Sequence, residues 1–80
     1  MTEEDKVRAV NANTLRQDPT FQAAVLEARR SALEELARIE PMDVEAIRNA
    51  QAKIRAIDAL TTALAGFIIT GTPQRMNPAV

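Results

Sequence analysis

The chain has 80 residues, ten of them lysine or arginine and eleven aspartate or glutamate, so its formal net charge is −1. This length allows one small domain, and an apolar content of 46% excludes a disordered charged tail. The chain contains no cysteine, histidine, tryptophan or tyrosine, which excludes disulfide bonds, structural zinc sites and catalysis by a thiol or an imidazole.

Near-neutral charge gives no long-range attraction to nucleic acid, so no nucleic-acid partner is expected. No charged-then-apolar signal peptide opens the chain. Its most apolar stretch, residues 59–69, is shorter than the roughly 20 residues that span a bilayer. We therefore expect a protein that is neither secreted nor membrane-bound, found in the cytoplasm or carried inside a particle.

The N-terminal segment carries a helix start signal. Thr2 is a suitable N-cap and is followed by three acidic residues, which favour the positive end of a helix dipole. Val7, Val10 and Leu15 form only a weak apolar edge. The segment predicts a short helix.

Asp18-Pro19 predicts the start of a longer helix, because aspartate is a favoured N-cap and proline suits the first helical position. Apolar residues then recur every three or four positions, which marks one helix face over residues 19–39. These residues are Phe21, Val25, Ala28, Ala32, Leu36 and Ile39, with Leu26 and Leu33 widening the stripe.

Pro41 interrupts this pattern, and a second long helix is predicted over residues 43–70. Asp43 is one candidate N-cap, and Glu40 with Pro41 at the first helical position is the other. Gly71 fits the residue just after a helix end, and Pro73 prevents resumption. The connection is short, so the two helices should be antiparallel. The predicted fold is an all-α helical hairpin in a single domain, residues 1–71, with an extended tail, residues 72–80.

The second long helix has two apolar faces. One is a heptad seam that should form the core of the hairpin; its members are Ile47, Ala50, Ile54, Ile57, Thr61, Leu64 and Ile68. The opposite face is made of small residues, Ala52, Ala56, Ala59, Ala63 and Gly66. Either this face is ordinary surface, since alanine favours helices, or it packs against a partner.

The second helix is also longer than the first, so its apolar end should overhang. Phe67, Ile68 and Ile69 are three successive apolar residues and cannot all face one hairpin. Either the N-terminal segment folds back over them or a partner subunit covers them. The tail is either a frayed end or an extended segment that docks in a partner groove through Met76 or Val80.

No residue pattern predicts an enzyme, a cofactor or a metal site. Ser31, the one serine, has no histidine to activate it, and no glutamate–histidine pair is present to hold a metal. The spacing of Glu27, Arg30, Glu34 and Arg38 predicts a ladder of ion pairs on a solvated face. There are two basic clusters, Arg29-Arg30 and Arg48 with Lys53 and Arg55, which leave open a phosphate-bearing small ligand held between subunits by arginines.

Three parts of the sequence together resemble small two-helix proteins encoded in the structural gene clusters of tailed bacteriophages. They are the Asp18-Pro19-Thr20-Phe21 start, the break near Pro41, and the apolar end Ile68-Ile69-Thr70-Gly71. The resemblance covers roughly residues 18–71. It implies a head-associated accessory protein of the virion and not an enzyme.

We therefore expect a non-enzymatic protein that self-associates or docks on a larger assembly such as a capsid. The predicted partner interface comprises Ala52, Ala56, Ala59, Ala63, Phe67, Ile68, Ile69 and Met76. The alternatives are a free anti-defence protein that inhibits a host protein or sequesters a nucleotide, and a DNA-binding regulator.

Overall fold

The computed structural model describes residues 1–72, which fold into three helices without a strand. They are α1 (Glu3–Gln17), α2 (Pro19–Arg38) and α3 (Val44–Gly71). The all-α class is therefore confirmed. Residues 73–80, with the predicted tail contacts of Met76 and Val80, lie outside the described part.

The helix starts follow the capping signals in the sequence. The Thr2 hydroxyl accepts from the Asp5 amide while the Asp5 carboxylate accepts from the Thr2 amide, each at 3.1 Å, which forms a capping box. Asp18 both ends α1 and caps α2, its carboxylate accepting from the Phe21 amide at 2.8 Å. A single residue in extended conformation thus separates the two helices.

The second connection runs from Ile39 to Asp43, and Asp43 is the N-cap of α3. Its carboxylate accepts from the Ala46 amide at 3.2 Å. The alternative start at Pro41 is therefore not used.

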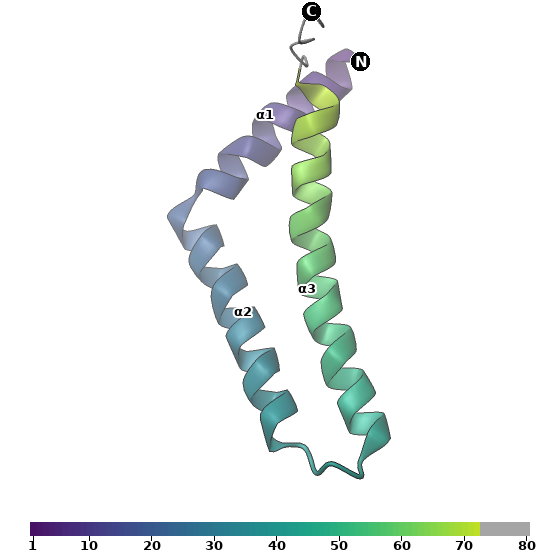
Figure 1. Cartoon of the computed structure of the whole chain (residues 1–80). Helices are drawn as coiled ribbons and strands as arrows, with labels where there is room; N and C mark the ends of the chain where they lie inside the picture. Colours follow the sequence, from purple (N-terminus) through teal and green to yellow (C-terminus); the bar gives the residue numbers. More distant parts are fainter. Residues whose placement is uncertain (73–80) are drawn as a thin grey trace, which may run out of the picture.

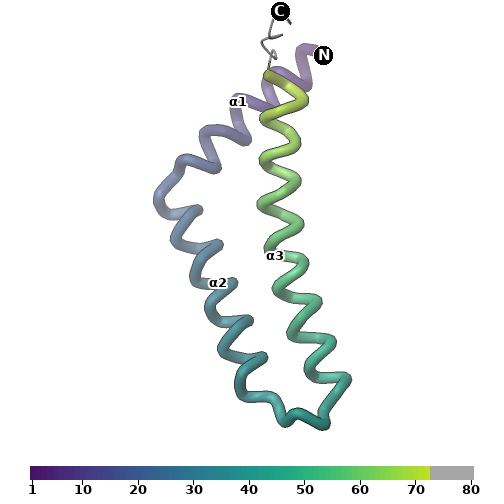
Figure 2. Tube along the Cα trace, in the orientation of Figure 1, coloured from purple at the N-terminus to yellow at the C-terminus, as the bar shows by residue number. Residues whose placement is uncertain are grey.

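The helices form the three sides of a long triangle (Figure 1). α2 and α3 run antiparallel from the connecting loop and diverge away from it, and α1 crosses back to the C-terminal end of α3 (Figure 2). The molecule is elongated, with extents of 54 × 32 × 23 Å.

α1 packs on the end of α3 through small residues. Ala9, Ala12 and Gly71 are all buried. A Cβ atom added to Gly71 would lie 2.0 Å from the Asp5 carbonyl oxygen and 2.5 Å from the Ala9 Cβ. Only a glycine allows this backbone approach, so the end of α3 is covered by the N-terminal segment of the same chain.

The role assigned to Gly71 from the sequence was wrong. The residue is the last of α3 rather than the residue after it, and its φ is not positive. Thr72 is the C-cap, in extended conformation. Close contact with α1, and not left-handed backbone geometry, explains the glycine.

The α2–α3 contact uses the predicted seam, but buries it incompletely. Ile47, Ile54, Ile57 and Leu64 of the seam are half-buried and Thr61 is exposed, while Ile68, also half-buried, lies at the end of α3 near α1. Only Ala32 and Ala50 are fully buried between these two helices. Two ion pairs at the rim join the helices, Arg29–Asp58 at 3.0 Å and Lys53–Glu35 at 2.9 Å.

Candidate association surfaces

The described part of the chain leaves many large apolar side chains exposed. No large side chain is fully buried within residues 1–72, and eleven large apolar residues are exposed. They are Met1, Val7, Val10, Leu15, Leu26, Leu33, Met42, Val44, Leu60, Phe67 and Ile69. Contiguous exposed apolar surface usually marks an interaction site, and these residues lie on several different faces of the molecule.

The small-residue face of α3 lies open to solvent. Ala52, Ala56, Ala59 and Ala63 are all exposed. A shallow hollow on this face is lined by Arg48, Gln51, Ala52, Arg55, Ala56 and Ala59. Within residues 1–72, neither Arg48 nor Arg55 forms an ion pair. The face therefore combines flat alanine surface with two uncompensated guanidinium groups.

The other predicted interface residues are divided by α1. Ile68 is half-buried and lines a hollow with Ala9 and Val10, so it faces α1. Phe67 is 41% exposed and Ile69 is 62% exposed. The Arg8 guanidinium carbon lies 5.3 Å from the centroid of the Phe67 ring, a cation–π geometry that ties α1 to this end of α3. The side chains of Phe67 and Ile69 are thus partly exposed, whereas Ile68 serves mainly the contact with α1.

A second apolar face, on α2, was missed in the sequence. Leu26 and Leu33 were assigned to the core stripe, but they are 68% and 43% exposed. They are seven residues apart and share a face with Gln22 and the half-buried Arg29. We call Gln22, Leu26, Arg29 and Leu33 the α2 leucine face. At 100° per residue these two leucines lie well to one side of Ala32 and Leu36, a signal that was present in the sequence.

A hollow opens beside the α2 leucine face, where α2 diverges from α3. Its volume is about 280 Å³, and almost all of its lining is apolar. The lining residues are Arg16, Phe21, Gln22, Val25, Leu26 and Thr61. The side-chain amide of Gln22 donates to the Arg16 backbone carbonyl at 2.8 Å, which fixes one wall of this hollow at the α1–α2 junction.

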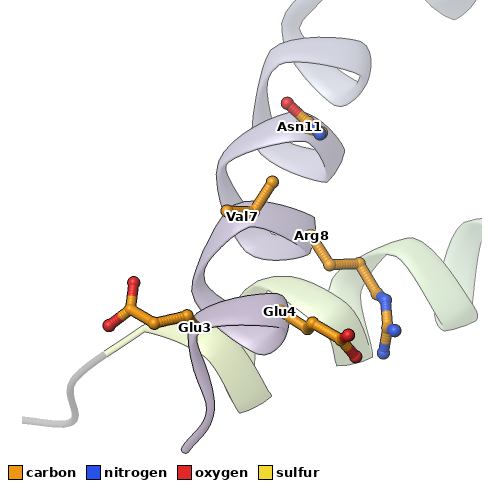
Figure 3. Close-up of a pocket in the computed structure, with 5 residues that line it drawn as sticks. All are labelled: Glu3, Glu4, Val7, Arg8 and Asn11. Atoms are coloured by element: carbon orange, nitrogen blue, oxygen red, sulfur yellow. The ribbon is translucent and has the colours of Figure 1, made fainter.

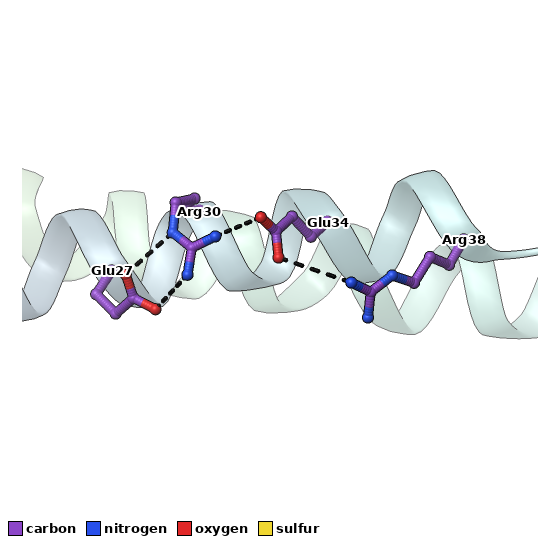
Figure 4. Close-up of polar contacts among 4 residues, drawn as sticks. All are labelled: Glu27, Arg30, Glu34 and Arg38. Carbon is purple, nitrogen blue, oxygen red and sulfur yellow. Dashed lines mark hydrogen bonds and ion pairs between the residues drawn. The ribbon is translucent and has the colours of Figure 1, made fainter.

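The predicted ion-pair ladder is present on the outer face of α2 (Figure 4). Arg30 bridges Glu27 and Glu34, and Arg38 lies 3.9 Å from Glu34. Hydrogen bonds from Arg30 lower the pKa of Glu27, and the same contacts raise the pKa of Arg30. All four side chains are largely solvated, so the ladder contributes solubility rather than a binding site.

A further shallow hollow lies along α1 and is lined by Glu3, Glu4, Val7, Arg8 and Asn11 (Figure 3). Its side chains fan out around one helix: Glu3 points away from Glu4, and the ends of Glu4 and Arg8 approach each other. The hydrogen bond with the Thr2 backbone lowers the pKa of Asp5, which stands at the start of this helix. These groups cap and solvate α1 and do not converge on a common point.

No group of three or more acidic side chains able to hold a metal ion occurs in residues 1–72. By length and composition α3 is apolar enough to cross a membrane, with a mean hydropathy of 1.4 over its best 18 residues. Only 11% of those 18 residues are buried in the structure, so α3 is not enclosed as the core helix of a globular domain would be.

Comparison of the chain with models of protein families, with curated proteins and with solved structures found no match.

Proposed function

We propose that this chain is a non-enzymatic interaction protein that becomes part of a larger protein assembly. The observation that carries this proposal is its uncovered apolar surface. Within residues 1–72, eleven large apolar side chains are exposed and no large side chain is fully buried. Side chains that would form the core of a compact domain here lie half-buried or exposed, as expected for a module completed by contacts with other subunits.

The docking surface in this proposal is the outward face of α3 with its exposed end. Ala52, Ala56, Ala59 and Ala63 present a flat surface to which another backbone can come close. Phe67 and Ile69 add large apolar side chains. The chain resembles small proteins encoded in the structural gene clusters of tailed phages. That resemblance implies that the larger assembly is a virion and that the chain is a head-associated component.

Mass spectrometry of gradient-purified particles tests this role. A structural component is present at a fixed copy number per particle, whereas a protein recovered only from the free cytoplasmic fraction is not a component. Ala56→Glu and Ala59→Glu should reduce incorporation, because each buries a charge in a close contact. Ala23→Glu, an exposed alanine on the ladder side of α2, is the matched control and should incorporate normally.

The same fractionation tests whether the chain associates with a membrane. We propose that the chain stays out of the membrane fraction. Insertion of α3 would place Arg55 and Asp58 in the bilayer and would break the Arg29–Asp58 pair. Recovery of the chain in detergent-extracted membranes would contradict this assignment.

One observation favours the alternative of a sequestering inhibitor. Arg48 and Arg55 lie beside the same hollow, with Gln51 between them, which is a donor set suited to a phosphate group. Titration with a nucleotide, compared between the wild type and Arg48→Ala with Arg55→Ala, separates the two roles. Saturable binding lost in the double variant would favour the inhibitor.

A further inference from the structure

The chain exposes more surface than a compact chain of the same mass, and a lower limit for this excess area can be calculated. If residues 73–80 are counted as fully exposed, they account for about 1,300 Å² at the area per mass of an unfolded chain. A compact domain of the other 72 residues exposes about 4,400 Å². The observed 6526 Å² still exceeds the two together by about 800 Å².

This excess is spread over the whole molecule and is of the same order as the area that each partner buries in a standard dimer, about 800 Å². The α2 leucine face is where such a partner fits. It offers two large exposed leucines at heptad spacing and an apolar hollow at one end. A hollow of about 280 Å³ falls below the usual range for small-molecule sites and suits aliphatic side chains.

We propose that a second copy of this chain packs antiparallel against the α2 leucine face. Leu33 of each copy then lies against Leu26 of the other and covers the hollow beside it. This inference rests on the proposed function, because it names one partner of an interaction protein, but it uses a different face from the one that docks on the assembly.

Three features favour a second copy of this chain as the partner and an antiparallel arrangement of the two α2 helices. In a two-fold pair whose centre lies near Arg29 and Arg30, Leu26 meets Leu33 of the second copy at both ends. Only an antiparallel pair brings each Leu33 over the other copy's hollow, and it also sets the two helix dipoles in opposition. The charge of Arg29 near the axis is compensated by Asp58 at 3.0 Å, and a chain of net charge −1 repels its copy little.

Light scattering coupled to size exclusion gives the first test. The wild type should have a mass near twice 8.8 kDa at micromolar concentrations. Leu26→Lys and Leu33→Lys should each weaken association at least tenfold while keeping the helix content, since lysine is a good helix former. Leu60→Lys, at a leucine that is 53% exposed on α3, is the matched control and should leave the dimer intact.

Disulfide trapping tests the direction, and the absence of native cysteine makes its readout specific. Mixing Leu26→Cys chains with Leu33→Cys chains under mild oxidation should give a crosslinked dimer, whereas either variant alone should not. Positions 26 and 33 of one chain are about 10.5 Å apart along α2, too far for an internal bond.

A wild type that remains at 8.8 kDa, or a dimer that survives both lysine substitutions, overturns this inference. Efficient crosslinking of the Leu26→Cys chain alone shows a parallel pair and overturns the arrangement. Incorporation into particles is measured separately, so a monomer that incorporates normally refutes the dimer and leaves the proposed function standing.

Discussion

α3 is contacted by both other helices, and the two contacts are built differently. α1 meets the end of α3 through Ala9, Ala12 and Gly71, which are fully buried and bring the backbones close together. α2 meets α3 through larger residues that remain half-buried, with ion pairs at the rim. The shortest helix therefore makes the tightest contact, and the long hairpin leaves apolar surface for other molecules.

The largest effect should come from filling the space at the α1 contact. Gly71→Ala places a Cβ atom 2.0 Å from the Asp5 carbonyl oxygen, so α1 must shift. We expect a loss of about 2–3 kcal/mol in the free energy of unfolding by urea. Gly66→Ala is the matched control: nothing lies within 4 Å of its added Cβ, and the change should stabilise α3 by up to about 1 kcal/mol.

Equal stability of the two alanine variants would contradict the close approach of α1. Hydrogen exchange gives an independent readout, because undocking should increase exchange in α1 and at the end of α3 while leaving the hairpin loop end unchanged.

The hairpin seam should respond less per residue. Ile54→Ala and Ile57→Ala should each cost about 1–2.5 kcal/mol, less than the 2–5 kcal/mol typical of full burial, because both residues are half-buried. Ile69→Ala makes the same change at a residue that is 62% exposed and should cost less than about 0.5 kcal/mol. A loss above 4 kcal/mol at Ile54 or Ile57 would mean that this seam is fully covered in solution, as in an oligomer.

The contrast between the two contacts also explains what the sequence could predict. The hairpin rests on capping residues and on a heptad pattern of large residues, both of which are local signals, so its helices were found within one or two residues. The α1 contact rests on small residues, and alanine is a strong helix former at buried and at exposed positions alike. Ala9 and Ala12 therefore gave no sign of burial, whereas Ala52 and Ala56, of the same type, are exposed.

Gly71 and Leu26 are two residues whose surroundings in the fold could not be predicted from local sequence rules. The glycine was explained by a local rule for helix ends, but it is set by the backbone of a helix some 60 positions earlier in the chain. From the sequence, Leu26 is expected to widen the apolar stripe of its helix. Leu26 is exposed because it lies about 100° around the helix from the half-buried Val25, beside the stripe that faces α3.

The junction between α1 and α2 should show a smaller effect. Asp18→Ala removes the carboxylate that accepts from the Phe21 amide and should cost about 1 kcal/mol in urea unfolding. Asp18→Asn keeps an N-cap acceptor and should stay within a few tenths of a kcal/mol of the wild type. Similar losses in both variants would mean that the charge, and not the cap, matters at this position.

The smallest effect should be the loss of stability at low pH that is caused by two carboxylates, Asp5 on α1 and Glu27 on α2. The pKa of Asp5 is lowered from 3.8 by the Thr2 backbone, and that of Glu27 from 4.5 by Arg30. Because the unfolded chain binds protons more readily than these native groups, their contribution is complete above the unfolded pKa values. The contribution of Glu27 is lost as pH falls below about 4.5, and that of Asp5 as pH falls below about 3.8, in each case through the lower native pKa. Asp5→Asn and Glu27→Gln should each flatten the fall in the urea midpoint in this range.

High salt should reduce the Glu27 contribution more than that of Asp5, because a solvated ion pair is screened whereas a capping hydrogen bond depends less on charge. Equal salt sensitivity of the two variants would show that Asp5 acts mainly through its charge, near Arg8 and the α1 dipole, rather than through the capping box.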